Sequence, residues 1–397
     1  MKILYLCQRI PFPPDRGDRI PVYHQVQRLR KTHEVVVGSL AHAGTRKNVE
    51  MLEKESGIKI LAPDHSRWRQ ISGMISQFLL GRPLSFGYFR NSALQKLIDA
   101  ELTESRFDAI IVFSSSMAQY VENLRGIPKI MHFCDVDSLK WESLARKSYW
   151  PLRWIYRRES RTLLACERKI AASFDASCVV SRNEAEIFHR YIPGITVDII
   201  ENGVDANYFS AFSRKTGGIN IVFVGVMDYP PNVEATAFFA RHIWSTLREV
   251  HPDAHFSIVG ARPAKSVLGL ARIPGIEVTG YVPDVRPYLA AATISIAPLG
   301  TARGVQNKIL EAMAAGVPVL TTPDVAKGLP DGAEALVFTA ERSAEAFAHT
   351  LLDLIEKEEM REKRAAEAGE FIRRNCGWDI KLRALDALLE RVVKSSC

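Results

Sequence analysis

The chain lacks a long hydrophobic run. Nowhere in its 397 residues does a segment approach the roughly 20 consecutive apolar residues that a membrane-spanning helix needs. The start, MKILYLCQRIPFPPDRGDR, reaches proline and charge after a few apolar positions, so we expect a first β-strand there rather than a targeting segment. With 47% hydrophobic and 24% charged residues, the chain is predicted to be a soluble protein of two domains.

Paired cysteines and metal-ligand spacings are also missing. The cysteines are scattered, with no CxxC pair and no histidines at zinc-ligand spacing. This pattern predicts reduced thiols in a cytoplasmic protein without a bound metal. The six cysteines are Cys7, Cys134, Cys166, Cys178, Cys376 and Cys397.

The charge balance favours anionic partners without choosing among them. A net charge of +7 suits nucleic acid, a phospholipid surface or a sugar nucleotide. The sequence has no aromatic-basic RNA signature and no zinc-finger spacing, so no nucleic-acid partner is predicted. Neither half has GxGxxG after its first apolar run, which disfavours a nicotinamide dehydrogenase.

Short apolar runs rich in β-branched residues alternate with segments of helical period. This alternation is typical of βα units whose parallel sheets are covered on both faces. The alternation restarts after residue 218, so two sheets are expected. The expected strands are 2–7, 33–40, 58–63, 107–115, 128–133, 176–181 and 196–200, then 219–225, 255–260, 276–282, 293–299, 317–322 and 335–339.

The polar, glycine-flanked segment NGVDANYFSAFSRKTGG separates the two sets of strands. It places an N-terminal domain at 1–205, a linker at 206–217 and a C-terminal domain at 218–376. The end, 377–397, has apolar residues at helical period and is expected to pack back on the N-terminal domain as a helix.

The most informative stretch is TISIAPLGTARGVQNKILEAMAAGVPVLTTP. A strand ends near Leu299, a helix is expected from about Val305 to Ala315, and Gly316 stops it. The helix start would face the ligand edge of an α/β sheet, where Arg303 and Lys308 suit a diphosphate. Lys308 and Glu311 share a helix face, so they suit a phosphate and a ribose diol, or equally form a simple exposed ion pair.

Several motifs resemble one enzyme family. LEAMAAGVPVL with the upstream Lys308, ENGVDANYF and FVGVMDYPPNVEA look like glycosyltransferase family 4, which has the GT-B fold. Over nearly its whole length, including FPPDRGD and VDSLKW, the chain is similar to the sugar transferases of bacterial PEP-CTERM/exosortase systems. The resemblance implies an α/β fold of two Rossmann-like domains whose parallel sheets face across a cleft. It also implies retention of configuration, no obligatory metal, no cofactor, and a nucleotide-diphosphate sugar held mainly by the C-terminal domain.

Family residues are carried over position by position. Glu311 matches the second acid of the family's E-x7-E motif, which holds the ribose hydroxyls, and Arg303 stands where many relatives have the first acid. The loop VGVMDYPPN lacks the Arg and Lys that many relatives use for the diphosphate, so Lys308 and Arg303 are expected to supply that charge. The other donor-binding residues are expected to be Gly304, Val305, Asn307, Gly225 and Asn232.

In the first domain, the loop PFPPDRGDRI lies where the family's glycine-rich loop approaches donor phosphate and acceptor. Arg16, Gly17, Asp18 and Arg19 would make those contacts, although a tight turn after a proline run is an equal alternative. His132 ends an expected strand and matches a family histidine that contacts the donor sugar, with a partly buried histidine hydrogen-bonded to the backbone as the alternative. With Lys308 and Glu311, it is assigned to catalysis.

For two further pairs of residues, the sequence allows either a functional or a structural role. Asp135 and Asp137 are candidates for a general base, or for caps of a helix starting near Leu139. Asn202 and Gly203 resemble the family's hinge-side motif, or form an ordinary Asn-Gly turn.

Two segments of the first domain interleave aromatic and basic residues. WESLARKSYWPLRWIYRR contains Trp150, Arg153, Trp154 and Arg157, and RWRQISGMISQFLLGRPLSFGYFR is of the same kind. Trp favours the headgroup layer of a membrane and arginine favours anionic lipid. Each segment is either a peripheral membrane contact or a half-buried helix with a basic face.

The predicted function is a cytoplasmic, hexosyl-type glycosyltransferase at the inner face of the membrane. It would move a sugar from a UDP- or GDP-sugar to a lipid-linked glycan acceptor in exopolysaccharide biosynthesis. A leaving phosphate oxygen would take the acceptor's proton, so no carboxylate base is required. The alternatives are a non-catalytic sugar-nucleotide sensor or assembly subunit, and a sugar-nucleotide epimerase. The sequence specifies neither the sugar nor the oligomeric state.

Overall fold

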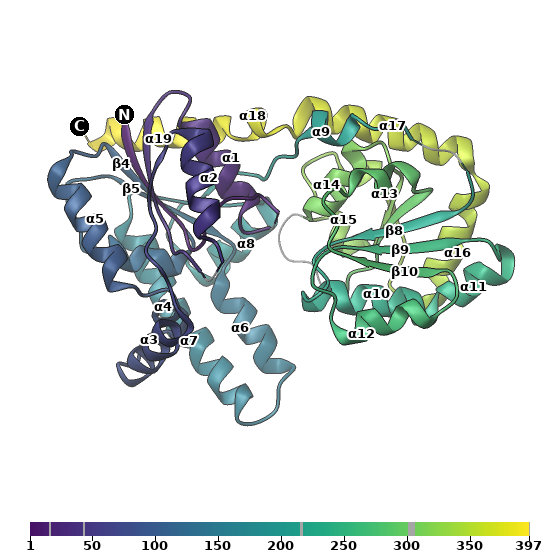
Figure 1. Cartoon of the computed structure of the whole chain (residues 1–397), viewed down its shortest axis with the longest axis horizontal. Coiled ribbons are helices and arrows are strands. Elements are labelled where there is room, and N and C mark those ends of the chain that lie inside the picture. Colours follow the sequence, from purple (N-terminus) through teal and green to yellow (C-terminus); the bar gives the residue numbers. More distant parts are fainter. Residues whose placement is uncertain (16, 43, 215–216, 301–305, 397) are drawn as a thin grey trace. The chain divides into compact units, whose positions relative to one another are not determined.

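Two units, each with its own parallel sheet, make up the chain in a computed structural model (Figure 1). The structure describes residues 1–15, 17–42, 44–214, 217–300 and 306–396. Unit 1 comprises Met1–Glu201 and Leu382–Cys397, and unit 2 comprises Asn202–Lys381.

Unit 1 has a seven-stranded sheet of order β3-β2-β1-β4-β5-β6-β7. Its strands are β1 (Lys2–Leu6), β2 (Glu34–Gly38), β3 (Lys59–Leu61), β4 (Ala109–Phe113), β5 (Lys129–Cys134), β6 (Ala176–Val179) and β7 (Asp198–Ile199). Its helices are α1 (Ile20–Leu29), α2 (Arg46–Ser56), α3 (Arg67–Leu79), α4 (Leu84–Tyr88), α5 (Ser92–Glu104), the 3-10 helix η1 (Ser115–Tyr120), α6 (Asp137–Arg146), α7 (Leu152–Ser173), α8 (Arg182–Tyr191) and α19 (Arg383–Ser396).

Unit 2 has a six-stranded sheet of order β10-β9-β8-β11-β12-β13. Its strands are β8 (Asn220–Val224), β9 (His255–Val259), β10 (Ile276–Gly280), β11 (Ile294–Ala297), β12 (Val319–Thr321) and β13 (Phe338–Thr339). Its helices are α9 (Ala206–Ser210), α10 (Pro230–His242), α11 (Trp244–Val250), α12 (Lys265–Leu268), η2 (Gly269–Arg272), α13 (Arg286–Ala291), α14 (Asn307–Ala314), α15 (Pro323–Ala326), η3 (Glu334–Leu336), α16 (Ala344–Glu356), α17 (Glu358–Asn375) and α18 (Trp378–Lys381).

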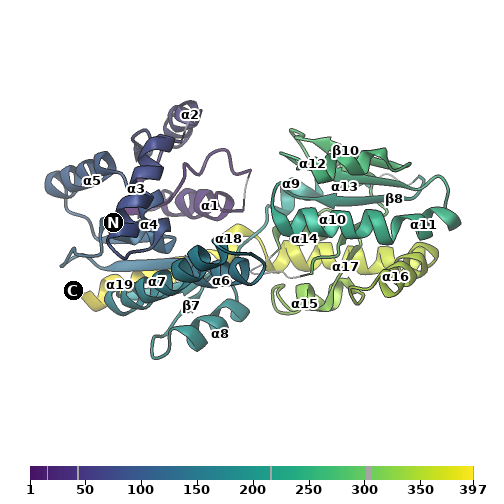
Figure 2. The same cartoon turned by 90° about the horizontal axis from the view of Figure 1, so that it is seen from below.

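The expected strands are confirmed, each within a few residues of its predicted ends, and their pairings are parallel. The strands are apolar on both sides because helices cover both faces of each sheet (Figures 1 and 2). Each unit buries its own core: Val112 and Met131 belong to that of unit 1, and Phe223 and Phe256 to that of unit 2. The prediction of two Rossmann-like α/β domains is therefore confirmed.

The C-terminal helix belongs to unit 1. The apolar residues predicted for one face of this helix are buried from Leu382 to Val392, whereas Ile380 lies before the helix and is exposed. Arg28 on α1 pairs with Asp386 at 2.8 Å, and Arg391 pairs with Asp198 of β7. The chain therefore returns to its first unit after completing the second.

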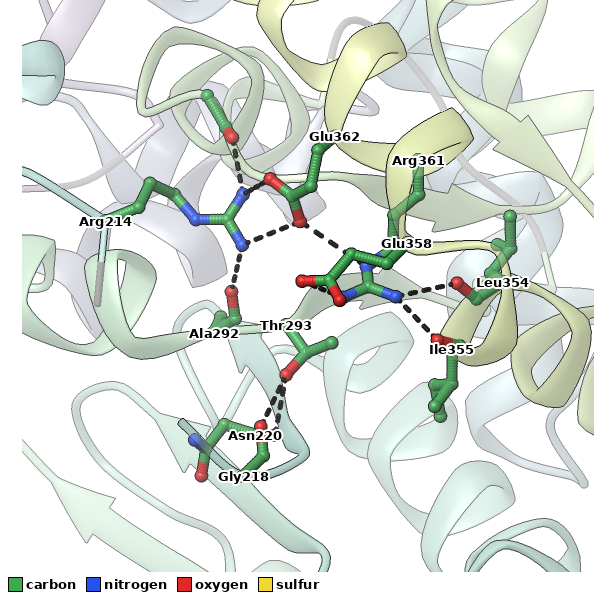
Figure 3. Close-up of polar contacts among 11 residues, drawn as sticks. Arg214, Gly218, Asn220, Ala292, Thr293, Leu354, Ile355, Glu358, Arg361 and Glu362 are labelled. Atoms are coloured by element: carbon green, nitrogen blue, oxygen red, sulfur yellow. Dashed lines mark hydrogen bonds and ion pairs between the residues drawn. The ribbon is translucent and has the colours of Figure 1, made fainter. Parts of the chain in front are cut away.

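Residues 206–217, expected as a linker, belong to unit 2 in the described part of the chain. Arg214 holds this segment in place, as Figure 3 shows. Its two terminal nitrogens donate to the carbonyl oxygens of Gly316 (2.7 Å) and Ala292 (2.8 Å) and pair with the carboxylate of Glu362 on α17. Gly316 immediately follows α14, so this arginine also binds the carboxyl end of the helix that carries Lys308 and Glu311.

Candidate functional site

The candidate site lies at the point of unit 2 where the strand order reverses. β8 and β11 are neighbours, and successive strands are added outward from them in opposite directions. Ligands of open parallel sheets bind outside the carboxyl ends of the strands at such a point. The loops after β8 and β11 and the start of α14 therefore form the expected binding edge.

Two glycines bring the backbones of neighbouring loops into contact at this edge. A Cβ built on Gly260, after β9, would lie 1.7 Å from the carbonyl oxygen of Gly225, after β8. A Cβ on Gly225 would lie 2.7 Å from the amide nitrogen of Asn232 and 3.4 Å from Nζ of Lys308. Gly225 was expected to let a ligand approach the backbone. In the structure its missing side chain leaves room for Asn232 and Lys308.

Lys308 lies in the first turn of α14 and reaches back across the edge. Its Nζ donates to Oδ1 of Asn232 at 2.5 Å and lies 4.7 Å from the centroid of the Phe223 ring. Asn232 is fixed because its amide nitrogen donates to the carbonyl oxygen of Val226 at 2.9 Å. Burial lowers the pKa of Lys308 to about 7, against the opposing effect of Glu311. An anionic ligand would favour the protonated ammonium.

Glu311 lies one turn further along α14. Burial raises the pKa of Glu311 to about 7, while the positive charge of Lys308 opposes the rise. The pair thus titrates together near neutral pH, with neither group fully charged. Groups whose pKa values are strongly shifted by burial are often found in functional sites, and these two lie at the edge of the sheet where ligands are expected.

The termini of α14 agree with the prediction from sequence. The helix runs from Asn307 to Ala314, and Gly316 ends it in a left-handed conformation (φ +67°). Its N-cap residue, Gln306, makes no side-chain capping bond. Arg303, Gly304 and Val305 lie outside the described residues.

The ENGVD motif supports the start of this helix. The side chain of Asn202 donates to Oδ1 of Asn307 at 3.4 Å. Gly203 does not have positive φ, and a Cβ there would lie 2.7 Å from Cα of Trp378. The Asn-Gly turn alternative is therefore wrong, and glycine is needed because α18 packs against the backbone.

Two arginines at the same edge were missed. Arg262, after β9, has a left-handed backbone (φ +55°) and its Nε pairs with Asp228 at 2.9 Å. Arg342, after β13, donates from Nε to the carbonyl oxygen of Pro298 at 3.1 Å and pairs with Glu234 at 3.2 Å. Their positions directly after expected strands were the available signal. Both arginines are therefore held at this edge by carboxylates of the same unit.

The corresponding edge of unit 1 also carries polar residues. Gln8, after β1, donates to the hydroxyls of Ser114 (2.7 Å) and Ser116 (2.8 Å), after β4. Ser114 and Cys134 both have positive φ, at +76° and +65°. Strained non-glycine residues at adjacent strand ends often accompany binding sites.

The loop expected to contact phosphate and acceptor is held by ion pairs. Asp18 pairs with Arg9 at 2.6 Å, and Arg19 pairs with Asp15 at 3.0 Å. Gly17 is exposed with no atom within 4 Å of a Cβ position and no positive φ. A side chain at position 17 would therefore be tolerated by the folded chain, and Arg16 lies outside the described residues.

His132 lies at the carboxyl end of β5, as expected, but its side chain is 0% exposed. Its ring centroid lies 4.8 Å from that of Phe113, and Nδ1 lies 3.6 Å from Sγ of Cys134. Burial lowers the pKa of His132 to about 4, which keeps the ring neutral, and Nε2 has no hydrogen-bond partner among the residues that the structure describes. In this conformation the ring has no surface on which to contact a sugar.

The two aspartates after β5 share a cation that the sequence did not indicate. Nζ of Lys140 lies 2.8 Å from Asp135 and 3.0 Å from Asp137. Helix α6 starts at Asp137 itself, and its N-cap residue, Val136, makes no side-chain cap. The capping alternative for these aspartates is thus wrong, because Glu167 on α7 accepts from the backbone nitrogen of Ser138 instead.

Glu167 is buried beneath this cluster, and its replacement gives a pH-dependent prediction. Burial raises the pKa of Glu167 to about 8, and Asp137 adds to the rise. Between about pH 4.5 and 8 the unfolded chain ionises this carboxyl while the folded chain keeps it protonated, so stability falls as pH rises. Glu167→Gln mimics the protonated form. The difference between its free energy of unfolding and that of the wild type should therefore shift in favour of the variant by at least about 1 kcal/mol as the pH rises from 5 to 8.

Urea unfolding at several pH values measures this difference. The matched control is Glu186→Gln, at an exposed position of the same unit. A pH-independent difference between Glu167→Gln and wild type would contradict the buried-carboxyl interpretation.

The expected membrane-contact residues Trp150, Arg153, Trp154 and Arg157 lie where α6 passes into α7, and all four are exposed. Among the described residues, no helix has the length and hydropathy needed to cross a bilayer. In the same part of the chain, no group of three or more His, Cys, Asp or Glu side chains is placed to hold a metal ion.

Comparison with protein families assigns both units. Residues 22–208 match the family described as "Glycosyltransferase Family 4", and residues 218–357 match "Glycosyl transferases group 1". No curated protein sequence matches the chain.

Solved structures share the fold over the whole chain. Sucrose-phosphate synthase from Thermosynechococcus elongatus has a TM-score of 0.76 at 13% identity, covering 100% of both chains. HepE of Anabaena, in complex with UDP and glucose, has a TM-score of 0.70 at 14% identity, covering 98% of this chain and 100% of its own. WaaG, a glycosyltransferase involved in lipopolysaccharide biosynthesis, has a TM-score of 0.64 at 16% identity, covering 99% of both. These likenesses show that the chain has the GT-B fold.

Proposed function

We propose that this chain, a family 4-type glycosyltransferase with the GT-B fold, moves a sugar from a UDP- or GDP-sugar to a lipid-linked acceptor with retention of configuration. The observation that carries the proposal is the Lys308–Glu311 pair on α14, at the reversal point of the unit 2 sheet. A cation and a carboxylate one turn apart match the diphosphate and the ribose diol of one nucleotide.

The donor binds mainly to unit 2 in this proposal. The ammonium of Lys308 would leave Asn232 for the diphosphate, and Glu311 would accept from the ribose hydroxyls. Arg303, with the neighbouring Gly304 and Val305, would contact the donor from the segment before α14, and Arg262 and Arg342 would contact its phosphates if they left Asp228 and Glu234. The structure of Anabaena HepE with UDP is consistent with a uridine nucleotide as the first donor to test.

Catalysis rests on orientation and charge stabilisation, without a metal or a cofactor. The acceptor hydroxyl would attack on the face from which the nucleoside diphosphate leaves, and a leaving phosphate oxygen would take the proton. Lys308 and the start of α14 would stabilise the departing charge. His132 is assigned to the donor sugar, a role for which its ring must first emerge from its buried position.

The acceptor is proposed to be a lipid-linked glycan in bacterial exopolysaccharide biosynthesis, within a PEP-CTERM/exosortase system. The supporting observations are the resemblance along the chain and the exposed tryptophans and arginines at the α6–α7 connection. A lipid-linked acceptor would place the enzyme on the inner face of the cytoplasmic membrane, as a peripheral protein.

The test follows nucleoside diphosphate release from a panel of UDP- and GDP-sugars, with and without lipid extract. Wild type should release the diphosphate of one donor in a lipid-dependent way. Glu311→Ala should be slower by roughly 10- to 100-fold, the cost of a charged hydrogen bond at the ribose.

Other outcomes would replace the proposal. Binding of a sugar nucleotide without release across the whole panel would indicate a sensor or assembly subunit. Conversion of the sugar nucleotide without an acceptor would indicate an epimerase.

A further inference from the structure

Helix α3 presents its apolar side chains to solvent. Trp68 is 80% exposed and Leu79 is 78% exposed, and Ile71, Ile75 and Phe78 are exposed between them. Residues 68, 71, 75 and 78 or 79 recur at helical spacing and so lie on one face of the helix. Ser72, Ile75, Ser76, Leu79 and Leu80 line an open groove along it. A helix of a water-soluble domain normally turns such a face inward.

The orientation of α3 is fixed by its contact with α4. A Cβ on Gly73 would lie 2.2 Å from the carbonyl oxygen of Gly87, and a Cβ on Gly87 would lie 2.3 Å from that of Gly73. The two helices therefore cross with their backbones in contact, and Gln77 is the buried residue of α3. This crossing uses the glycine face of α3 and leaves Trp68, Ile75 and Leu79 of its apolar face largely exposed.

The α6–α7 connection extends the same surface. Figure 1 shows α6 and α7 running side by side away from the sheet of unit 1. Glu159 on α7 accepts from the backbone nitrogens of Leu84 (2.6 Å) and Ser85 (2.8 Å), which ties α7 to the start of α4. Trp154 packs edge-on against Phe78 of α3, with ring centroids 6.1 Å apart.

The joined surface is therefore both aromatic and exposed. Tyr149 is 90% and Trp150 is 84% exposed beside Trp154, so two segments that are far apart in the sequence contribute aromatic side chains to one area. Arg158 binds the segments together, because its guanidinium lies over the Phe78 ring and donates to the carbonyl oxygen of Arg82.

Positive charge surrounds this area. Residues 65–98 contain no aspartate or glutamate, and neither do residues 143–158. The exposed cations of the two segments are Arg67, Arg69, Arg82, Arg90, Arg146, Lys147, Arg153 and Arg157. Arg146 pairs with Glu142, just before the second range. The charged residues within the two ranges are all lysine or arginine.

We infer that the α3 face and the α6–α7 connection form one membrane-docking surface, with α3 lying in the plane of an anionic bilayer. The inference rests on the proposed function for its purpose, since it names the partner that brings unit 1 to a lipid-linked acceptor. A bilayer matches all three features: tryptophan and tyrosine favour the headgroup layer, the α3 face enters the acyl boundary, and the arginines meet anionic lipid. A protein partner would need an apolar surface for the α3 face and acidic residues for the arginines around it.

Vesicle flotation with the full-length protein tests the inference. The wild type should float with vesicles of phosphatidylglycerol and phosphatidylcholine and largely lose binding at high salt or with phosphatidylcholine alone. Ile75→Asp combined with Leu79→Asp should reduce the bound fraction at least about tenfold, because two charges would enter the acyl boundary. Arg153→Glu combined with Arg157→Glu should weaken binding and flatten its salt dependence.

The matched control is Met51→Asp, which places the same charge on an exposed apolar residue of α2 in the same unit and should leave binding unchanged. Circular dichroism and UDP binding, both measured without lipid, report whether each variant is folded and whether the donor site works. If the transferase proposal fails, the failure is seen as lost UDP binding or as no diphosphate release from the donor panel. If the docking inference fails, the failure is seen in vesicle flotation.

Absence of wild-type flotation at low salt would overturn the inference, as would equal flotation of the Ile75/Leu79 variant. Self-association of the wild type without vesicles that the same variant abolishes would also overturn it, in favour of a contact between copies of the chain.

Discussion

Lys308→Ala is expected to lower kcat/KM for sugar transfer by roughly 30- to 1,000-fold, which corresponds to about 2–4 kcal/mol of lost transition-state stabilisation. The reason is that Nζ of Lys308 contacts a neutral amide oxygen and an aromatic ring, with Glu311 one turn away, at an edge where a departing diphosphate would gain charge. An ammonium already held in place stabilises that charge without reorganisation. Initial rates of diphosphate release over a range of donor concentrations measure the effect.

The pH profile separates this role from a structural one. The pKa values of Lys308 and Glu311 are both displaced to about 7. Below that pH Glu311 loses its negative charge by protonation, and above it Lys308 loses its positive charge by deprotonation. Donor affinity of the wild type should therefore be greatest near neutral pH and fall on both sides. Lys308→Ala should lose the alkaline limb.

Lys327→Ala is the matched control, since Lys327 is an exposed lysine of the same unit whose ion pair with Asp324 is on the surface. It should retain wild-type rates, because exposed pairs contribute little. Unchanged turnover of Lys308→Ala, with an unchanged alkaline limb, would remove Lys308 from the proposed mechanism.

The strands were predictable from sequence because strands of a covered parallel sheet are apolar on both sides. β8, for example, consists of Asn220 followed by four buried residues. The end of α14 was predictable for a similar local reason. Gly316 adopts the left-handed conformation that glycine permits without strain, and Pro318 follows it.

The surroundings of each candidate side chain were not predictable in the same way. His132 was correctly placed at a strand end, but its burial depends on Phe113 of the neighbouring strand. For the start of α6, a cap from a local aspartate was one of two alternatives, whereas Ser138 N donates to Glu167, 29 residues away. Local sequence specifies which groups need a partner, and only the fold specifies which residue provides it.

The close approach between the backbones of Gly225 and Gly260 was likewise not predictable from sequence. Gly225 and Gly260 read as single glycines after two separate strands, which is weak evidence of any site. Pairing of β8 with β9 places them side by side, with the nitrogen of Gly225 donating to the carbonyl oxygen of Val259 at 2.9 Å. Their shared role follows from parallel register, which sequence alone leaves open.

Gly260→Ala is expected to destabilise unit 2 by about 3 kcal/mol or more, because two costs add. The residue has φ +149°, which side-chain-bearing residues rarely adopt, and the new Cβ would lie 1.7 Å from Gly225 O and 2.7 Å from Gly225 C. The obstructing atoms are backbone, so no side-chain rotation can relieve the overlap. Urea unfolding of the variant and the wild type measures the loss.

The control substitution is Gly269→Ala, at a glycine of the same unit with no atom within 4 Å of a Cβ position and φ of −63°. It should change stability by less than about 1 kcal/mol. Both loops that meet at Gly260 are fixed to each other, since Met227 N donates to Ala261 O and Ala264 N donates to Met227 O. Relief of the overlap must therefore disturb the contact between the two loops, one of which carries Gly225 beside Lys308, and UDP affinity should fall even where Gly260→Ala remains folded. Wild-type stability and wild-type UDP affinity in this variant would show that the two backbones do not meet in solution as they do in the structure.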